Sequence, residues 1–215
     1  MSIRVICIGA GGHAAVVVDL LQRLSERSEI SLAGLVTPDG SGAPVLGVDV
    51  IGADGDLGRL IAQHDLTHFI VAVGSTRGGQ NIRASLYRLA AEKGLAPLTA
   101  VHPDAVVAPS ARLGEGTVIM AGAVVQARTV IGNNVIINTR ASIDHDCEVG
   151  ANVHIAPGAV LSGGVRLGDD VHIGTGAVII ENVRVGAGTT VAAGATVVRN
   201  CGERQLLVGT PARVI

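Results

Sequence analysis

An aliphatic side chain recurs every six residues between Val101 and Val197, and every position of this first column is Val, Ile or Leu. A second column lies four residues further on in each repeat, from Ala105 to Ala195, and holds only small or β-branched residues. An α-helix of period 3.6 cannot keep both columns on one face, and a simple strand alternates with period 2. A period of six, with glycines between the aliphatic residues, is typical of a hexapeptide β-helix.

In a hexapeptide β-helix, three repeats form one triangular coil, and equivalent residues of successive coils stack at about one strand spacing, ~4.8 Å. The large aliphatic side chain points inward from a flat side, and the small residue fills the corner. One coil cannot bury its inner face alone, but about five stacked coils share a continuous core. We therefore predict a parallel β-helix over residues 98–215. Its left-handed sense is inferred from recognising the repeat and not from the spacing.

The bulk composition excludes several classes of function. With 215 residues, the chain suits one or two domains. Its formal net charge of −2 gives no basic surface, and Phe69 and Tyr87 are the only aromatic residues, so nucleic-acid binding is disfavoured. Glycine or a charged residue interrupts every apolar run well before the ~18 residues that a membrane span needs.

The cysteines and the first ten residues indicate the cellular compartment in which the protein is expected. Cys7, Cys147 and Cys201 form an odd set in apolar surroundings, without the spacing of a metal site, which fits a reducing cytoplasm. Residues 1–10 are interpreted as one short strand and not as a signal peptide. We therefore expect a cytoplasmic protein.

The chain opens with a strand, a glycine-rich turn and a helix. Residues 3–8 are predicted as a buried strand, and residues 15–24 as a helix that buries Val16, Leu20, Leu21 and Leu24. Free N–H groups converge at such a turn and favour a phosphate. The turn also satisfies the loose G-x-G-x-x-G/A pattern of dinucleotide folds, although by its spacing alone it could simply be a tight turn.

The remaining N-terminal elements complete a small α/β unit. We predict strands over 30–36 and 69–73, a hairpin or edge strand over 45–51, and helices over 57–63 and 80–93. The last helix is expected to bury Ile82, Leu86 and Leu89. Thr37 stands where a dinucleotide fold places an acid for the ribose. Residues 1–97 are therefore predicted as a half-Rossmann-like domain that suits a mononucleotide, such as the carrier of a nucleotide sugar.

One histidine of the β-helix stands out as a candidate catalyst. His145 holds the third position of its repeat, which points outward, and Asp144 and Asp146 flank it. His154 and His172 hold the sixth position of their repeats and should stack on adjacent coils. For His172 and for His102, near the first coil, we favour a solvated surface histidine.

The setting of His145 indicates general-base chemistry. Transfer of an acyl group from a thioester to a largely protonated amine requires a base. A carboxylate bound to the other ring nitrogen fixes the tautomer and raises the basicity of the imidazole, and Asp146 is the candidate for this role. Cys147 occupies an inward position and should be inert, so direct attack is the simpler mechanism. The turn Ser162-Gly163-Gly164 offers a backbone donor for the oxyanion.

These motifs resemble those of the bacterial nucleotide-sugar N-acetyltransferases of the sialic acid O-acetyltransferase-like group, whose best-known members acetylate the 4-amino group of UDP- or GDP-linked amino sugars. The resemblance spans almost the whole chain. It rests on the segments Gly-Ala-Gly-Gly-His at 9–13, Val-Gly at 73–74, Asn-Thr at 138–139, Ile-Asp-His-Asp-Cys at 143–147 and Val-Gly-Thr-Pro-Ala-Arg at 208–213.

The resemblance implies roles for individual residues. It makes His145 the general base and Asp146 the residue that tunes it, where many relatives carry Glu. It implies acetyl-CoA as co-substrate, no metal, and a homotrimer with active sites between neighbouring coils. The other positions that match binding residues of the family fall into three sets: the acetyl-CoA contacts His154, Gly163, Thr175 and Ala193; the sugar contact Asn138; and the nucleotide-sugar pocket Gly11, Gly12, His13 and Gly74.

The leading hypothesis is an acetyl-CoA-dependent N-acetyltransferase that acts on a nucleotide-linked amino sugar for surface glycan synthesis. O-acetylation of a sialic acid or another sugar is a close alternative, since the same base would deprotonate a hydroxyl. A zinc hydratase would need three converging imidazoles, for which His145, His154 and His172 are poorly spaced. A non-catalytic solenoid subunit or sensor and a dinucleotide oxidoreductase are further alternatives. The choice between UDP and GDP stays open.

Overall fold

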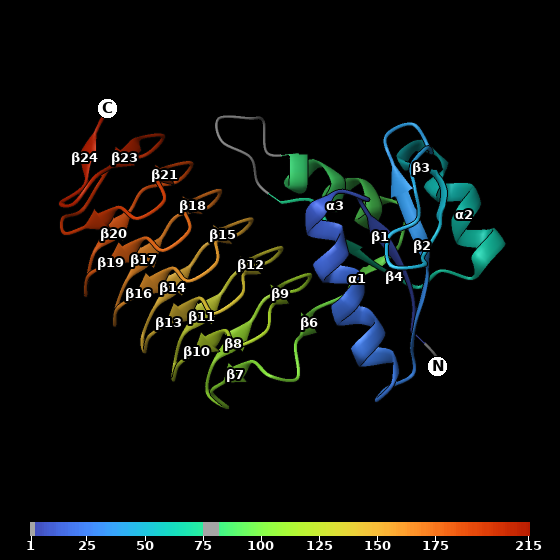
Figure 1. The fold of residues 1–215 in the computed structure, drawn as a ribbon, viewed down its shortest axis with the longest axis horizontal. Helices are drawn as coiled ribbons and strands as arrows, with labels where there is room; N and C mark the ends of the chain where they lie inside the picture. Colours follow the sequence, from blue (N-terminus) through green and yellow to red (C-terminus); the bar gives the residue numbers. More distant parts are fainter. Residues whose placement is uncertain (1–2, 75–81) are drawn as a thin grey trace. The chain divides into compact units, whose positions relative to one another are not determined.

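The N-terminal half contains a parallel five-stranded sheet with helices that connect its strands. The computed structural model describes residues 3–74 and 82–215, and its contacts divide the chain into Met1–Ala100, here the N-terminal unit, and Val101–Ile215, here the β-helix unit (Figure 1). The sequence placed this division after residue 97. Each unit is described by itself.

The sheet of the N-terminal unit has the order β3-β2-β1-β4-β5, and all its pairs are parallel. Its strands are β1 (Ile3–Ile8), β2 (Ile30–Thr37), β3 (Val50–Ala53), β4 (His68–Val71) and β5 (Ala96–Pro97). The helices are α1 (Gly12–Ser25), the 3-10 turn η1 (Asp54–Asp56), α2 (Leu57–His64) and α3 (Ile82–Glu92). This is the predicted half-Rossmann-like arrangement.

Two predicted helix faces were wrong in part. Helix α1 begins at Gly12, three residues earlier than predicted. It buries the predicted Leu20 and Leu21 together with Ala14, Val17 and Val18, whereas the predicted Val16 is 43% exposed. The spacing i, i+3, i+4, i+7 of Ala14, Val17, Val18 and Leu21 defines the buried stripe, with Leu20 at its margin and Val16 outside it.

In α3, the predicted inward residue Ile82 is exposed, and Arg83 is buried instead. The Arg83 guanidinium Nη1 donates to the Val73 carbonyl over 2.7 Å, and this contact anchors the helix to the end of β4. Residues 80 and 81 of the predicted helix lie outside the described residues, as do Ser75 and Thr76. The predicted edge strand over 45–51 is displaced: β3 begins at Val50 and pairs parallel with β2, after an antiparallel bridge between Val45 and Val48.

The β-helix unit consists of three sheets of two- or three-residue strands that stack coil upon coil (Figure 1). Sheet I contains β6 (Ala100–Val101), β9 (Val118–Ile119), β12 (Ile136–Ile137), β15 (His154–Ile155), β18 (His172–Ile173), β21 (Thr190–Val191), β23 (Leu206–Val208) and β24 (Arg213–Val214). Sheet II contains β7 (Val106–Val107), β10 (Val124–Val125), β13 (Ser142–Ile143), β16 (Val160–Leu161), β19 (Val178–Ile179) and β22 (Thr196–Val197). Sheet III contains β8 (Arg112–Leu113), β11 (Val130–Ile131), β14 (Glu148–Val149), β17 (Arg166–Leu167) and β20 (Arg184–Val185).

The register of the coils follows the repeat. Strands three repeats apart pair in parallel, as Val124 does with Ser142, and only the last pair, β23 with β24, is antiparallel. Both predicted columns point inward and are buried from Ile119 to Val197. The chain passes from sheet I to sheet II at the I/II corner, represented by residues 138–141, and from sheet II to sheet III at the II/III corner, represented by residues 144–147. This is the left-handed parallel β-helix that the sequence predicted.

Two kinds of backbone position shape the corners. The fourth residue of many repeats has a positive φ and is Gly, Asn, Asp or Arg, as at Asp146 with φ of 59°. At the corner that follows sheet III, successive coils approach so closely that a Cβ on Gly132 would lie 2.7 Å from the carbonyl carbon of Gly150. Only glycine fits there without a shift of the backbone.

Among the described residues, no helix is both long enough and apolar enough to cross a membrane.

Candidate functional site

His145 lies at the II/III corner, directly after β13, and its side chain is 58% exposed. The Asp144 carboxylate accepts a hydrogen bond from the His145 backbone N–H over 2.8 Å and holds the turn. The His145 ring atom Nδ1 lies 2.7 Å from Asp146 Oδ2. A carboxylate only accepts, so Nδ1 carries the proton, and in the neutral ring Nε2 is left with the lone pair.

The Asp146 carboxylate has a second partner, Arg128, which lies at the same corner one coil earlier. Arg128 Nε donates to Asp146 Oδ1 over 2.6 Å and Nη2 donates to Oδ2 over 2.7 Å, which is a bidentate pair. The hydrogen bonds from Arg128 and then from His145 hold the pKa of Asp146 well below its ordinary value. Asp146 is therefore ionised at neutral pH, and its orientation is fixed from two sides.

Gly163, one coil after His145 at the same corner, gives the imidazole its space. A Cβ on Gly163 would lie 2.7 Å from His145 Cε1 and 2.8 Å from Nε2, so a larger residue would push the ring away. The neighbouring Gly164 N–H donates to the His145 carbonyl over 2.9 Å and ties the two coils together. The Gly163 backbone therefore lies beside the nitrogen that carries the lone pair.

The other predicted acetyl-CoA and sugar residues lie elsewhere on the prism. His154 and His172 pair on adjacent strands of sheet I, with ring centroids 5.0 Å apart. Asn138 Nδ2 lies 3.4 Å from His154 Nε2. Thr175 and Ala193 are exposed on successive coils at the I/II corner, where the Gly194 N–H donates to the Thr175 carbonyl.

The predicted residues thus form two groups in the β-helix unit. His145, Asp146 and Gly163 share the II/III corner. His154 lies in sheet I, and Asn138, Thr175 and Ala193 lie at the I/II corner that follows this sheet. Cys147 is buried at an inward position, its Sγ lies 3.2 Å from the Ser162 carbonyl oxygen, and burial raises the pKa of its thiol. It is not placed to act as a nucleophile.

The predicted nucleotide residues line one cavity of about 600 Å³ in the N-terminal unit. Gly11, Gly12, His13 and Gly74 all contribute to its wall, where α1 begins with no acidic residue in its first turn and no side-chain cap on its N–H groups. Burial, with a smaller effect of the Arg83 charge, lowers the pKa of His13 to about 4. The cavity therefore combines uncharged donors with an open helix N-terminus.

The backbone of this cavity requires one glycine in particular. Gly9 has φ of 113°, and a Cβ there would lie 2.7 Å from Val73 Cγ2. Thr37, in place of an acid, donates from Oγ1 to the Ser41 carbonyl over 2.9 Å and closes its own turn.

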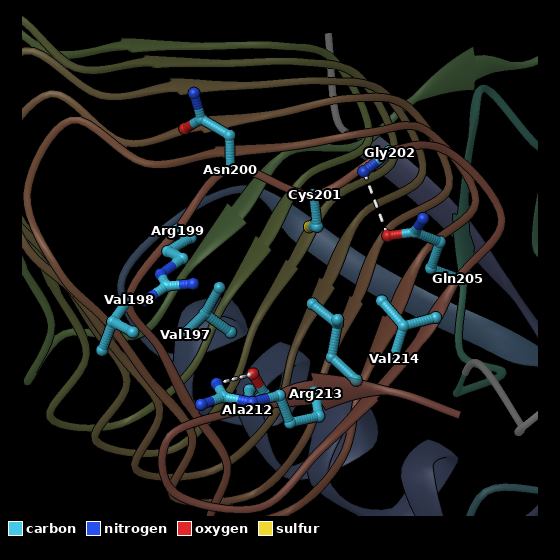
Figure 2. Close-up of a pocket in the computed structure, with 11 residues that line it drawn as sticks. Val197, Val198, Arg199, Asn200, Cys201, Gly202, Gln205, Ala212, Arg213 and Val214 are labelled. Atoms are coloured by element: carbon cyan, nitrogen blue, oxygen red, sulfur yellow. Dashed lines mark hydrogen bonds between the residues drawn. The ribbon is translucent and has the colours of Figure 1, made fainter.

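A second cavity of about 280 Å³ lies at the C-terminal end of the β-helix unit, lined by residues of the last coil, of β23 and of the antiparallel strand β24 (Figure 2). Val197 and Leu207 contribute apolar wall, and Arg199 and Arg213 lie at its margin. Arg213 Nη1 donates to the Ala212 carbonyl over 3.0 Å. None of the predicted site residues lines it.

In the part of the chain that the structure describes, no group of three or more His, Cys, Asp or Glu side chains is arranged to hold a metal ion.

Comparisons with known proteins identify the family. The PglD N-terminal domain model matches residues 4–88, and the bacterial transferase hexapeptide model matches residues 128–163 and 164–199. A histidine-to-alanine mutant of GDP-perosamine N-acetyltransferase from Caulobacter crescentus, in complex with CoA and GDP-perosamine, is 40% identical with a TM-score of 0.90, over 98% of this chain and 96% of that chain. The chain belongs to the nucleotide-sugar N-acetyltransferase family.

Other relatives agree with this assignment. The acetyltransferase domain of PglB from Neisseria gonorrhoeae, in complex with acetyl coenzyme A, is 39% identical with a TM-score of 0.88 and covers 100% of both chains. WeeI from Acinetobacter baumannii shares the fold at 24% identity. The comparison with curated proteins gave no match. The predicted family, the predicted fold and the predicted class, a CoA-dependent acyltransferase, are confirmed.

Sequence reasoning missed two polar residues of these sites. Arg128 precedes Asp146 by one full coil, so the stacking rule that paired His154 with His172 would also have found it. Asp54 follows β3 and lines the N-terminal cavity. It was missed because the strand before it was placed too early in the sequence.

Proposed function

We propose that this nucleotide-sugar N-acetyltransferase transfers the acetyl group of acetyl-CoA to the C4 amino group of a nucleotide-linked amino sugar, with His145 as general base. The observation that carries the proposal is the 2.7 Å contact between His145 Nδ1 and Asp146 Oδ2, which leaves Nε2 as the acceptor at an exposed corner. Relatives at about 40% identity bind CoA together with GDP-perosamine, which supports the same pair of substrates here.

The chemistry follows from this geometry. His145 Nε2 takes a proton from the sugar amine while the amine nitrogen bonds to the thioester carbonyl carbon. The resulting oxyanion requires a donor, and the Gly163 N–H beside the ring is our candidate. When the C–S bond breaks, the imidazolium returns its proton to the CoA sulfur, so the products are an acetamido sugar and the free thiol of CoA.

We further propose that the active enzyme is a homotrimer with its active sites between subunits. The support is the separation of the two groups: His145 and Gly163 lie at the II/III corner, whereas His154, Thr175 and Ala193 lie on sheet I and the I/II corner. If both groups act on one thioester, the second group must come from a neighbouring chain. Residues 98–215 would then form the acyltransferase domain.

The N-terminal unit, residues 1–97 of the predicted division, is proposed to hold the nucleotide. Gly11 and Gly12 at the start of α1 would contact the phosphates, with His13 and Gly74 on the cavity wall, and Asn138 would contact the sugar. The free cysteines support a reducing compartment, and we place the reaction in the cytoplasm. The acetylated sugar nucleotide would serve synthesis of a surface polysaccharide.

The test is incubation with acetyl-CoA and a panel of UDP- and GDP-linked 4-amino sugars, with release of the CoA thiol followed by a thiol reagent. Matched sugars that carry a hydroxyl at C4 distinguish N- from O-acetylation. We expect turnover on an amine, a loss of about 10²- to 10⁴-fold in kcat for His145→Asn, and no loss for His64→Asn, a histidine of the N-terminal unit that lines neither site. Unchanged turnover in His145→Asn would refute the assigned base.

A further inference from the structure

Asp54 is the one carboxylate among the described residues that line the N-terminal cavity. Its Oδ1 is buried and has no hydrogen-bond partner in the described part of the chain, and burial raises the pKa of the carboxyl. The two nearby acids do have hydrogen-bond donors. Asp39 accepts from the Ser41 N–H and hydroxyl, and Asp56 Oδ2 accepts from the Ala53 N–H. A buried acceptor without a donor costs free energy, and a ligand in the cavity would recover that cost only if it brought a donor within reach of this oxygen.

The strand order sets where Asp54 lies along a bound nucleotide. The sheet runs β3-β2-β1, with the glycine turn after β1, Thr37 at the end of β2, and Asp54 directly after β3. Thr37 and Ala53 are paired neighbours in the register of these strands. In folds of this kind the phosphates bind at the turn after the first strand and the ribose at the end of the next. One strand spacing further on, ~4.8 Å, Asp54 lies on the side where the base of a nucleotide bound in this way would follow the ribose.

A carboxylate in this place distinguishes the bases by their hydrogen-bonding edges. It offers two acceptor oxygens and no donor when ionised. Guanine alone presents two adjacent donors, N1–H and the N2 amine, on one edge. Uracil presents N3–H between two carbonyl oxygens, which would repel the carboxylate, and adenine and cytosine present an amine beside an acceptor nitrogen.

We propose that Asp54 reads the base of the donor nucleotide and selects guanine, so that the sugar carrier is GDP. This inference rests on the proposed function, in which the cavity holds the nucleotide. It answers the choice between UDP and GDP, which the sequence left open, and it assigns Asp54 as the residue that determines specificity. The bound GDP-perosamine of two relatives is in keeping with this choice.

The first experiment measures binding of free nucleotides to the full-length enzyme by calorimetry. GDP is expected to bind at least about 100-fold more tightly than UDP, because UDP leaves the carboxylate facing carbonyl oxygens. IDP, which differs from GDP only by the missing N2 amine, should bind about tenfold more weakly than GDP.

The second experiment replaces the two acceptor oxygens of the Asp54 carboxylate by the side-chain amide of Asn. In Asp54→Asn the side chain offers one acceptor and one donor, which match the N1–H and the C2 carbonyl of xanthine. We expect GDP affinity to fall by about 100-fold and xanthosine diphosphate affinity to rise above that of the wild type. Loss of a purely structural carboxylate would weaken all nucleotides alike. Asp49→Asn, at an exposed acid just before β3, is the matched control and should leave all affinities unchanged.

The outcomes separate the inference from the proposed function. If the wild type binds UDP as tightly as GDP, or if Asp54→Asn leaves the ratio of GDP to xanthosine diphosphate affinity unchanged, the assignment of Asp54 is wrong while the acetyltransferase proposal stands. If neither nucleotide binds, the nucleotide-sugar proposal itself fails. Should Asp54→Asn not fold, the comparison of GDP, IDP and UDP on the wild type still decides.

Discussion

At the scale of single residues, the chemistry of the β-helix unit depends on a turn position that most repeats fill with Gly or Asn. Asp146 takes the left-handed conformation there, which Asp tolerates better than longer side chains. The short side chain of Asp146 reaches His145 and Arg128 together. The imidazole therefore faces a carboxylate whose charge Arg128 already balances in part.

Replacement of Arg128 by Gln should change the pH dependence of catalysis. Without the guanidinium, Asp146 loses the hydrogen bonds that contribute most to its lowered pKa, so its carboxylate becomes protonated at a higher pH than in the wild type. Because the ionised carboxylate accepts the proton of His145 Nδ1, we expect the acid limb of the kcat/KM profile to move upward. The other charged residues of the II/III corner near His145 are Asp144, whose carboxylate accepts from the His145 backbone N–H, Glu181, two coils after His145, and Arg199, three coils after it.

The matched control for Arg128→Gln is Arg166→Gln, which removes the comparable exposed pair with Glu148 on sheet III. This control should leave the pH profile in place. A downward move of the acid limb in Arg128→Gln, or an equal move in both variants, would contradict the electrostatic account.

A second single residue, His13 in the wall of the N-terminal cavity, makes the stability of the N-terminal unit depend on pH. Its pKa in the folded state is about 4, below the ordinary value of 6.5, because burial disfavours the charged form. Above pH 6.5 both states are neutral, but between pH 6.5 and 4 only the unfolded chain takes up the proton, so the folded unit loses stability as the pH falls. At pH 5 the loss should be about 2 kcal/mol, and His13→Asn should remove it.

Fluorescence of Tyr87 measures this effect, because it is the single tyrosine of a chain without tryptophan and it packs in the core of the N-terminal unit. Urea titrations at pH 7.5 and 5 give the loss for each variant. Equal losses in wild type and His13→Asn would show that other groups dominate the acid sensitivity.

At the scale of elements, the repeat predicted the β-helix almost residue by residue because its two columns and its corners are local consequences of one period. The same reasoning was weaker for α1 and α3. The short apolar pattern of each helix is compatible with more than one buried face. The face that packs on the sheet buries Val17 and Arg83 and leaves Val16 exposed. For the site, adjacent residues such as His145 and Asp146 were found, whereas Arg128 and Asp54 depend on stacking and on the true position of β3.

Close approach of the coils gives an element-scale prediction. Gly132→Ala places a Cβ 2.7 Å from backbone atoms of Gly150, which side-chain rotation cannot relieve. We expect a loss of about 1–3 kcal/mol in the stability of the β-helix unit, measured by far-ultraviolet circular dichroism in denaturant. Gly58→Ala, in α2 with open space around it, is the control and should stabilise the N-terminal unit by about 0.5 kcal/mol.

At the scale of the whole molecule, the two units have separate hydrophobic cores, one of stacked aliphatic columns and one around β1, β4 and α2. Each unit therefore supports the residues that we propose for ligand binding on a hydrophobic core of its own. Within the part of the chain that the structure describes, the residues proposed for acyl transfer are divided between two surfaces of the β-helix unit.

That arrangement makes subunit complementation the decisive test of the proposed trimer. His145→Ala removes the base from the II/III corner, and His154→Ala removes the histidine of sheet I, so each pure variant should be impaired. The two variants are refolded together in equal amounts. If each site combines these two surfaces from different chains, each surface is intact with a chance of about one half, so about a quarter of the sites have both. Activity should then recover to about a quarter of the wild-type value in particles of about three times the 21.6 kDa chain mass, measured by light scattering. A mixture no more active than its components would mean that each chain completes its own site, and that His145 and His154 serve different steps.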